Sequence, residues 1–324
     1  MKKLIVNIPA YNEAKNIAKT VKSVPREIAG ISEVLVQVVD DGSRDSTAEV
    51  AKEAGADIVV SHSTNRRLGA VFNTAVESAI DNGADLMVNI DADGQFDSRQ
   101  IPEMVAPILS GEADITIGDR FNRGTAEGIP FLKSFLNRLA AKVVGAFLNV
   151  EIHDLTCGFR AHSREALLRL NQVTGFTYTQ ETIIDAIGKK LKLKWIPVRV
   201  RYFEDRQSRI VKSVWSFVNN SFKIIIKAIR DVRPMKFFGL PGLVLISLSG
   251  VFFAVFLYLY LPNLQITPYR NHLLVAIAFF LVGLQFLVFA LLSDMTKTNR
   301  QMIEYLAYRE KLRRWRKARR RKMS

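Results

Sequence analysis

The sequence predicts an α/β protein with a mostly parallel sheet, followed by a two-helix transmembrane hairpin. Short apolar runs alternate with helix-length segments in the first part of the chain, and acidic turns follow several of these runs. Two long stretches without any charged residue lie near the C-terminus. Strands that alternate with helices form right-handed βαβ units, so these strands are expected to lie parallel in one sheet.

The elements of this sheet follow one another at short intervals. After the second strand, Asp45 or Ser46 is expected to cap the next helix. An arginine-rich loop, Asn65–Gly69, follows the third strand. The strands are expected at 4–8, 34–39, 57–61, 86–90 and 115–118, and the helices between the first four end near Val24, Gly55 and Asn82.

Two acidic residues, Asp91 and Asp93, directly follow the fourth strand. Residues i and i+2 of an extended segment point to the same face, so both carboxylates can converge on one cation where a parallel sheet binds its ligands. Hard oxygen ligands suit Mg²⁺ or Mn²⁺ that also contacts substrate phosphates. A turn that only caps the next helix is the alternative interpretation. An EF-hand loop fits poorly, because its sixth and twelfth positions would be Phe96 and Pro102.

The turns lack the glycine-rich patterns of dinucleotide-binding and P-loop proteins. Acidic turns at three strand ends instead suggest a nucleotide held by its base and ribose, with a metal at its diphosphate. I-P-A-Y-N-E (8–13), V-V-D-D-G-S-R-D-S-T (38–47) and D-A-D-G-Q (91–95) resemble, in order and spacing, the motifs of family-2 glycosyltransferases with the Rossmann-like GT-A fold. The resemblance covers about residues 1–210. I-G-D-R (117–120), T-C-G-F-R-A (156–161) and Q-E-T (180–182) are similar to segments of the polyprenyl-phosphate glycosyltransferases, the dolichyl-phosphate mannose synthase group and its bacterial undecaprenyl-phosphate relatives.

This resemblance implies an inverting, metal-dependent enzyme that transfers a hexose from a nucleotide-diphosphate sugar to a dolichyl or undecaprenyl phosphate. Asp91, Asp93 and Arg120 are then the expected catalytic residues, and Asp91, Asp93 and Gln95 shape the site of Mg²⁺ or Mn²⁺. The motifs do not choose among GDP-mannose, UDP-glucose and UDP-N-acetylglucosamine, and they do not give the length of the lipid. The nucleotide-sugar-binding residues implied by the family are Pro9, Ala10, Tyr11, Glu13, Val39, Asp41, Asp91, Ala92, Asp93, Gln95, Arg206, Ser208 and Arg209, with Asp40 as the residue that instead supports its turn.

On the acceptor side, the resemblance implies that Arg120, Lys133 and Asn137 bind the lipid phosphate. Lys133 and Asn137 are one helical turn apart and so share a face, although Lys replaces the Arg that is more usual in the family. A phosphate monoester has a second pKa of about 6, so near neutral pH it needs cations more than a base. Glu181 matches an acidic position on the acceptor side, or is a helix N-terminal charge favoured by the dipole.

The segment 199–209 is expected to close over the diphosphate. Relatives carry a Gly shortly before the Ser of this loop, whereas this chain has Arg206–Gln207–Ser208. This departure leaves the exact geometry of the loop open, and a solvated or lipid-facing role is an equal alternative for most of its arginines.

Two uncharged stretches, Phe237–Leu261 and Leu273–Leu292, each reach the roughly 20 residues that cross a bilayer as a helix. The short link Pro262–His272 joins them into a transmembrane hairpin. Basic residues flank both outer ends, so the positive-inside rule places the catalytic domain and both termini in the cytoplasm. A buried helical pair in a soluble domain is the alternative, and uncharged spans of this length argue against it.

The segments beside the hairpin are both basic. Val211–Val232 has apolar residues at helical spacing between lysines and arginines, which predicts an amphipathic helix in the headgroup layer, with a core helix as the competing interpretation. From Lys297 the tail carries twelve Lys or Arg against two Glu. A loose apolar stripe from Met302 to Trp315 predicts a helix that packs against another subunit of a homo-oligomer or lies on an anionic lipid surface.

Composition sets the remaining bounds. The 324 residues are 48 % hydrophobic, which is enough for a substantial core. The single Cys157 excludes a disulfide framework, and no signal peptide is visible. The net charge of +15 fits an anionic membrane or a nucleic acid. The expected organisation is a catalytic domain at 1–210, an amphipathic region at 211–236, the hairpin at 237–292 and a basic tail at 293–324.

Two other functions were weighed against the sequence. A processive polysaccharide synthase has the same fold, but the chain has only two predicted spans and no Q-x-x-R-W segment. A membrane-anchored nucleic-acid binder would use the basic tail, yet the chain shows no recognition fold, and its acidic turns would repel phosphodiesters.

Overall fold

The protein was analysed as a computed structural model. It describes residues 2–122, 126–127, 131–171, 178–201, 222–223, 225–226, 229–262 and 264–321. The chain forms two compact units, the first built from residues 1–225 and 304–324 and the second from residues 226–303. The predicted loop 199–209 beyond Arg201 and the predicted amphipathic helix up to residue 221 lie outside the described residues.

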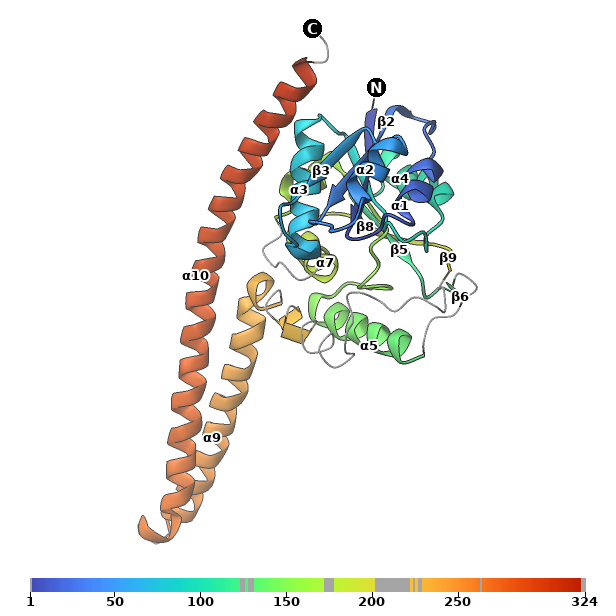
Figure 1. The fold of residues 1–324 in the computed structure, drawn as a ribbon. Coiled ribbons are helices and arrows are strands. Elements are labelled where there is room, and N and C mark those ends of the chain that lie inside the picture. The colour runs from blue at the N-terminus through green and yellow to red at the C-terminus, as the bar shows by residue number, and fades with distance from the viewer. Residues whose placement is uncertain are drawn as a thin grey trace. The chain divides into compact units, whose positions relative to one another are not determined.

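A seven-stranded sheet forms the centre of the first unit (Figure 1). Its strand order is β3-β2-β1-β4-β7-β5-β8, and every neighbouring pair is parallel except the two that involve β7. This confirms the predicted mostly parallel α/β fold. The strands are β1 (Lys2–Ala10), β2 (Ile31–Asp40), β3 (Ile58–Ser61), β4 (Leu86–Asn89), β5 (Ile115–Asp119), β7 (Arg160–Ser163) and β8 (Leu193–Pro197), and β6 (Ala126–Glu127) pairs separately with β9 (Val200–Arg201).

The helices of the first unit connect these strands. In α3, the residues at positions 71, 72, 75, 76, 79 and 80 are all buried, which is the spacing of one apolar helix face. The helices are α1 (Ile17–Ser23), α2 (Thr47–Glu53), α3 (Arg67–Asp81), the short η1 (Ser98–Gln100), α4 (Ile101–Leu109), α5 (Phe131–Leu148), α6 (Arg164–Arg169) and α7 (Thr179–Gly188).

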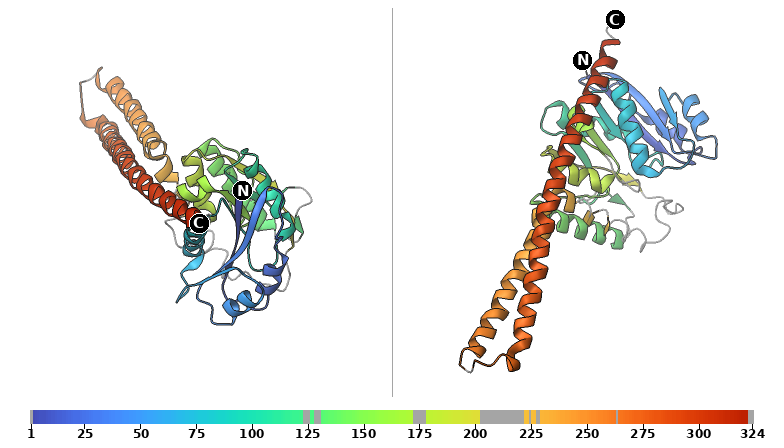
Figure 2. Two further views of the ribbon diagram at one scale, coloured as in Figure 1. Left: turned by 90° about the horizontal axis from the view of Figure 1, so that it is seen from above. Right: turned by 90° about the vertical axis from the view of Figure 1, so that its left-hand side faces the viewer.

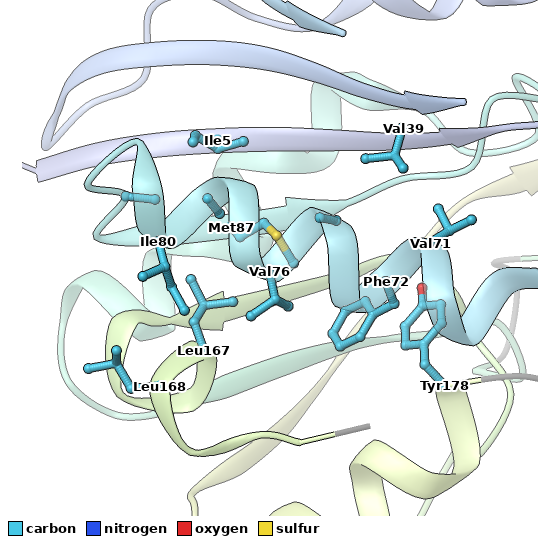
Figure 3. Close-up of a cluster of buried hydrophobic side chains, with 13 residues drawn as sticks. Ile5, Val39, Val71, Phe72, Val76, Ile80, Met87, Leu167, Leu168 and Tyr178 are labelled. Carbon is cyan, nitrogen blue, oxygen red and sulfur yellow. The ribbon is translucent and has the colours of Figure 1, made fainter. Parts of the chain in front are cut away.

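A hydrophobic cluster joins α3 to the sheet and to α6 (Figure 3). Ile5 of β1, Val39 of β2 and Met87 of β4 contribute from the sheet. At one end of the cluster the rings of Phe72 and Tyr178 are stacked, with centroids 4.2 Å apart. This cluster anchors the strands whose carboxyl ends carry the acidic turns.

Strand β7 was not expected from the sequence. It inserts between β4 and β5 and carries two fully buried polar residues, Arg160 and His162. Arg160 donates to the carbonyl oxygens of Cys157 and Thr179, each at 2.7 Å, which satisfies much of its guanidinium without a carboxylate. Burial lowers the pKa of His162 to about 3, so this histidine is neutral at physiological pH.

The end of the long helix α10 (Arg270–Arg321) belongs to the first unit. Tyr308, Leu312 and Trp315 pack against the hydrophobic cluster, and Trp315 Nε1 donates to the carbonyl of Ala84 at 2.8 Å. The C-terminal half of the apolar stripe is therefore covered within the chain, whereas Met302, Tyr305 and Leu306 are exposed. For that exposed half, packing against a second subunit or a lipid surface stays a prediction.

Polar contacts surround this apolar contact. Arg314 pairs with Asp81 at 2.5 Å and also with Glu77, both on α3. The buried Lys311 Nζ donates to the carbonyl of Leu170 at 2.9 Å and to Asn171 Oδ1 at 3.0 Å. The residues at 313, 316, 317, 320 and 321, all Arg or Lys, are exposed on the other side of the helix.

The second unit contains α9 (Leu240–Tyr260), the π-helical turn η2 (Met235–Gly239), η3 (Thr267–Tyr269) and the first part of α10, which lies beside α9 (Figure 2). A Cβ on Gly283 would lie 2.9 Å from the carbonyl oxygen of Gly242, so the two helix backbones are in direct contact there. Ser249 Oγ donates to the carbonyl of Ala276 at 2.7 Å.

Met235–Tyr260 and Arg270–Arg321 are long and apolar enough to cross a membrane. Only 17 % of the most apolar window of each is buried, which is unlike a pair of core helices in a soluble domain. These helices indicate membrane association.

Candidate active site

The turns after β1 and β2 lie side by side because the two strands pair in parallel up to their ends. Pro9 pairs with Val39 and Ala10 with Asp40, and Asp41 N donates to the carbonyl of Ala10 at 2.8 Å. The sheet thus brings together Pro9, Ala10, Val39 and Asp41, which the sequence assigned to one nucleotide pocket.

Side chains lock these two turns to each other. Asn12 has a left-handed backbone (φ 52°), its N donates to Ser43 Oγ at 2.8 Å, and its Oδ1 accepts from Arg44 N at 2.8 Å. Glu13 N donates to Thr47 Oγ1 at 2.9 Å. The backbone on both sides of Tyr11 is therefore fixed before any ligand binds.

The adjacent acids Asp40 and Asp41 have different partners. Asp40 Oδ1 accepts from Ser43 N at 3.2 Å, so it supports its own turn. Asp41 accepts from the backbone N of Arg66 and Arg67 at 2.8 and 2.9 Å, and these residues stand at the N-terminus of α3. Asp41 is therefore buried as a bridge between β2 and α3, and its place in the nucleotide pocket stays a prediction.

The D-A-D turn follows β4 at the same edge of the sheet. Asp91 and Asp93 are both partly exposed, whereas Ala92 is buried and its carbonyl accepts from Thr20 Oγ1 at 3.0 Å. Asp93 Oδ1 accepts from Gln95 N at 3.0 Å. Both acids are therefore accessible in part, and the convergence of their carboxylates on one cation stays a prediction from the i, i+2 spacing.

Two carboxylates suit a divalent ion that takes its remaining ligands from a substrate. Within the described residues, no three His, Cys, Asp or Glu side chains gather as a self-sufficient metal site. Mg²⁺ typically binds one or two carboxylates together with substrate phosphates and water. The donor set of Asp91 and Asp93 therefore fits a metal that arrives with a nucleotide diphosphate.

A buried polar cluster surrounds Arg120 at the end of β5. Arg120 Nε donates to Asp154 Oδ2 at 2.7 Å and its Nη2 donates to Asp154 Oδ1 at 2.9 Å, a two-point contact with a fully buried carboxylate. Asn137 Nδ2 of α5 donates to Asp154 Oδ1 at 3.3 Å, and Asn137 Oδ1 accepts from Thr156 Oγ1 at 3.0 Å. Burial opposes ionisation, but the charge and hydrogen bonds of Arg120 hold the pKa of Asp154 below its usual value.

The structure thus joins Arg120 and Asn137, two of the three predicted acceptor residues. Lys133 is on the same helix, and its side chain lies outside the described residues, as do Arg206, Ser208 and Arg209. Glu181 is buried in the first turn of α7, beside the buried Gln180.

Sequence reasoning missed several residues that hold the site together. His62 Nδ1 lies 2.8 Å from Asp41 Oδ1, and its other ring nitrogen lies 2.9 Å from Thr74 Oγ1. Asp154 organises the Arg120 cluster, and Gly158 lies against Asp91. Gly158 lies in the T-C-G-F-R-A segment, but neither that motif nor a repeated pattern indicates its contact with Asp91 or the roles of His62 and Asp154, so only the fold reveals them.

A mostly parallel α/β sheet with acidic turns at its carboxyl edge matches the GT-A fold. The chain belongs to glycosyltransferase family 2: the family described as "Glycosyl transferase family 2" matches residues 5–170. The protein is accordingly a glycosyltransferase.

Known proteins of this family resemble the chain over most of its length. It is 29 % identical over 231 residues to a polyprenol monophosphomannose synthase of Mycolicibacterium smegmatis, covering 68 % of this chain and 84 % of that one. It is 26 % identical over 268 residues to a dolichol-phosphate mannosyltransferase of Pyrococcus furiosus, covering 81 % and 74 %. Its fold matches glucosyl-3-phosphoglycerate synthase of Mycobacterium tuberculosis, solved with Mn²⁺, UDP-glucose and phosphoglyceric acid, with a TM-score of 0.56, 20 % identity, and coverage of 70 % and 80 %.

Proposed function

We propose that the protein transfers a hexose from a nucleotide-diphosphate sugar to a polyprenyl phosphate, dolichyl or undecaprenyl, at the cytoplasmic face of a membrane. The relatives named for polyprenol- and dolichol-phosphate mannose transfer support this acceptor class. The chain adds two long apolar helices that suit a lipid substrate.

The observation that carries the proposal is the construction of α5. Asn137, on its inner side, belongs to the buried cluster of Arg120. Phe135, Leu139 and Val143 recur every four residues on its outer side and are about half exposed, at 53, 49 and 57 %. One helix therefore joins the cluster proposed to bind phosphate to an exposed apolar surface, which would suit a phosphate attached to a hydrocarbon chain.

The donor binds at the turns that follow β1, β2 and β4. The turns after β1 and β2 hold the nucleotide. Asp91 and Asp93, with Gln95 nearby, would hold Mg²⁺ or Mn²⁺, which would offset the charge that develops on the leaving nucleotide diphosphate. The acceptor phosphate is largely a dianion at neutral pH, so it needs positioning by Arg120 more than deprotonation. Direct attack of its oxygen on the anomeric carbon inverts the configuration.

The test is transfer of labelled sugar into lipid. Membranes that contain the protein, supplied with Mn²⁺ and each of GDP-mannose, UDP-glucose and UDP-N-acetylglucosamine, are expected to form an organic-extractable, acid-labile product from one donor. Membranes with Asp93→Asn, whose exposed turn position leaves the fold intact, are the control and should form none. The absence of product with every donor, or an undiminished rate in Asp93→Asn, would contradict the proposal.

A further inference from the structure

Gly158 lies directly against the carboxylate of Asp91. A Cβ at this position would be 3.0 Å from both Asp91 Oδ1 and Oδ2, which is closer than ordinary van der Waals contact. Gly158 does not have a positive φ, so its backbone conformation would accept a side chain. Glycine is required here because a side chain would collide with the carboxylate of Asp91.

The backbone of Gly158 is held from both sides. Its carbonyl accepts from Tyr178 Oη at 3.0 Å and from Asn89 Nδ2 at 3.3 Å. The carbonyl of the next residue, Phe159, accepts from Gly118 N of β5 at 2.9 Å. A methyl group added at Gly158 therefore cannot be relieved by a retreat of the backbone.

The groups that hold Gly158 are themselves fixed in the core. Asn89 also donates to Tyr178 Oη at 2.6 Å, and its Oδ1 accepts from Asn7 Nδ2 of β1 at 2.7 Å. Gln37 of β2 donates to Asn7 Oδ1 at 3.0 Å. The ring of Tyr178 lies flat against Phe72 (Figure 3). A buried network that spans β2, β1 and β4 thus supports the surface on which Asp91 rests.

We propose that Gly158 sets the position of the Asp91 carboxylate and thereby the affinity of the D-A-D turn for a divalent cation. This inference rests on the proposed function, because it requires a metal at that turn. Metal–ligand distances are tight to about 0.2 Å, whereas a methyl at Gly158 displaces the carboxylate by a few tenths of an ångström. The fold tolerates this shift, because the carboxylate is the rotatable end of a partly exposed side chain. Gly158 is a positioning residue, which acts only through Asp91.

The experiment measures the binding of GDP and of UDP by calorimetry at increasing concentrations of Mn²⁺. Gly158→Ala should require about tenfold more Mn²⁺ for half-maximal binding, because changing a group that orients a metal ligand typically costs about 10–100-fold in metal affinity. Its thermal unfolding without ligand should remain close to that of the wild type. Gly250→Ala, at a glycine with no neighbouring atom within 4 Å of the added Cβ, is the matched control and should leave the Mn²⁺ dependence unchanged.

A double-mutant cycle identifies Asp91 as the mediator. In an Asp91→Asn background, Gly158→Ala should cause no further change in the Mn²⁺ dependence. If Gly158→Ala alone fails to fold, adding the shorter side chain of Asp91→Ala should restore folding, and persistent misfolding would overturn the inference. A wild-type response to Mn²⁺ in Gly158→Ala would overturn this inference alone. Nucleotide binding by the wild type that is independent of Mn²⁺ would overturn both this inference and the metal-dependent function.

Discussion

The side chain of Asp154 determines the charge that Arg120 presents. Its buried carboxylate accepts two hydrogen bonds from the guanidinium and also binds the backbone N of Thr156 at 3.0 Å and of Cys157 at 3.1 Å. Removing one partner of such a pair leaves the other charge buried and uncompensated, at a cost of about 3–5 kcal/mol. Arg120 is therefore held in place by Asp154, and its charge at the proposed acceptor site is partly compensated.

The stability of an Asp154→Asn variant should depend on pH differently from that of the wild type. The pKa of Asp154 lies below the ordinary aspartate value of 3.8 in the folded state. Its ionised form therefore stabilises the fold above pH about 4, and this contribution disappears as pH falls through the lower folded pKa. Asp154→Asn is expected to lower the free energy of unfolding by about 3 kcal/mol from pH 5 to 7, with the difference shrinking below pH about 4. Denaturant unfolding in detergent across this range measures it, and a difference that stays constant down to pH 3 would contradict the assignment.

Removal of the Lys133 charge should separate acceptor from donor binding. Lys133→Ala is expected to raise the KM for polyprenyl phosphate about tenfold, because one cation near a phosphate dianion is lost, while the affinity for nucleotide stays unchanged. Lys142→Ala, at an exposed position of the same helix, removes the same charge and should change neither quantity. Steady-state kinetics and calorimetric titration of the nucleotide give the two values. Weaker nucleotide binding by Lys133→Ala would reassign this lysine to the donor diphosphate.

Among the elements, the end of α10 contributes to the stability of the first unit although it is the most basic part of the chain. Trp315 packs on the hydrophobic cluster, binds the carbonyl of Ala84 and lies under the guanidinium of Arg164, whose Cζ is 4.5 Å from the ring centroid. The ion pairs of Arg314 are partly exposed and add little, since exposed pairs contribute at most about 1 kcal/mol. Apolar burial therefore accounts for most of the docking.

Trp315→Ala should destabilise the first unit by about 3 kcal/mol, the lower end of the range for a buried aromatic residue, because Trp315 is only half-buried. Thermal unfolding and resistance to limited proteolysis should both decrease. Lys317→Ala, exposed on the other side of the same helix, should change the unfolding free energy by less than about 0.5 kcal/mol. Equal stability of the two variants would show that the tail is docked without stabilising the unit.

For the whole molecule, an even number of spans predicts that both termini lie on one side of the membrane. Cys157 is fully buried, and burial raises its pKa to about 12, so the native thiol does not react at neutral pH. The chain is therefore a suitable background for single introduced cysteines. In intact cells, a membrane-impermeant thiol reagent should label Gln265→Cys in the link, whereas Lys317→Cys in the tail should react only after permeabilisation. The reverse pattern would invert the topology predicted from the basic flanks.

The sequence predicts the parts of this molecule in which a physical pattern repeats. Apolar runs of strand length and acids at i and i+2 locate β1, β2, β4 and the D-A-D turn, because burial and side-chain alternation leave a periodic trace. Strand β7 leaves none, since Arg160 and His162 are satisfied or neutralised only by tertiary contacts. The apolar residues of the tail predict that some apolar surface packs against them. That Tyr308, Leu312 and Trp315 pack on α3 and α6 of the same chain depends on the surface of those helices, which the tail sequence does not show.

Part of the candidate site was equally inaccessible to sequence reasoning. A single aspartate, Asp154, carries no spacing signal, and the T-C-G-F-R-A motif that contains Gly158 does not indicate which residue this glycine contacts. Asp154 matters because it lies next to Arg120, and Gly158 matters because it lies next to Asp91. The pairing of the strands brings these residues together. The resemblance to a family located Arg120 and Asn137, whereas the carboxylate that joins them becomes apparent only in three dimensions.

The docking of α10 also determines when the first unit can be completed during synthesis. Residues up to 225 leave the ribosome well before residue 304, by roughly 4–16 s at 5–20 residues per second. Until then, the surface that Tyr308, Leu312 and Trp315 cover is open to solvent. Final packing therefore follows translation of both apolar helices, and a chain that stops before the tail keeps an apolar surface that chaperones and proteases recognise. Burial of this apolar surface therefore distinguishes a chain in which the end of α10 has docked from one in which it has not.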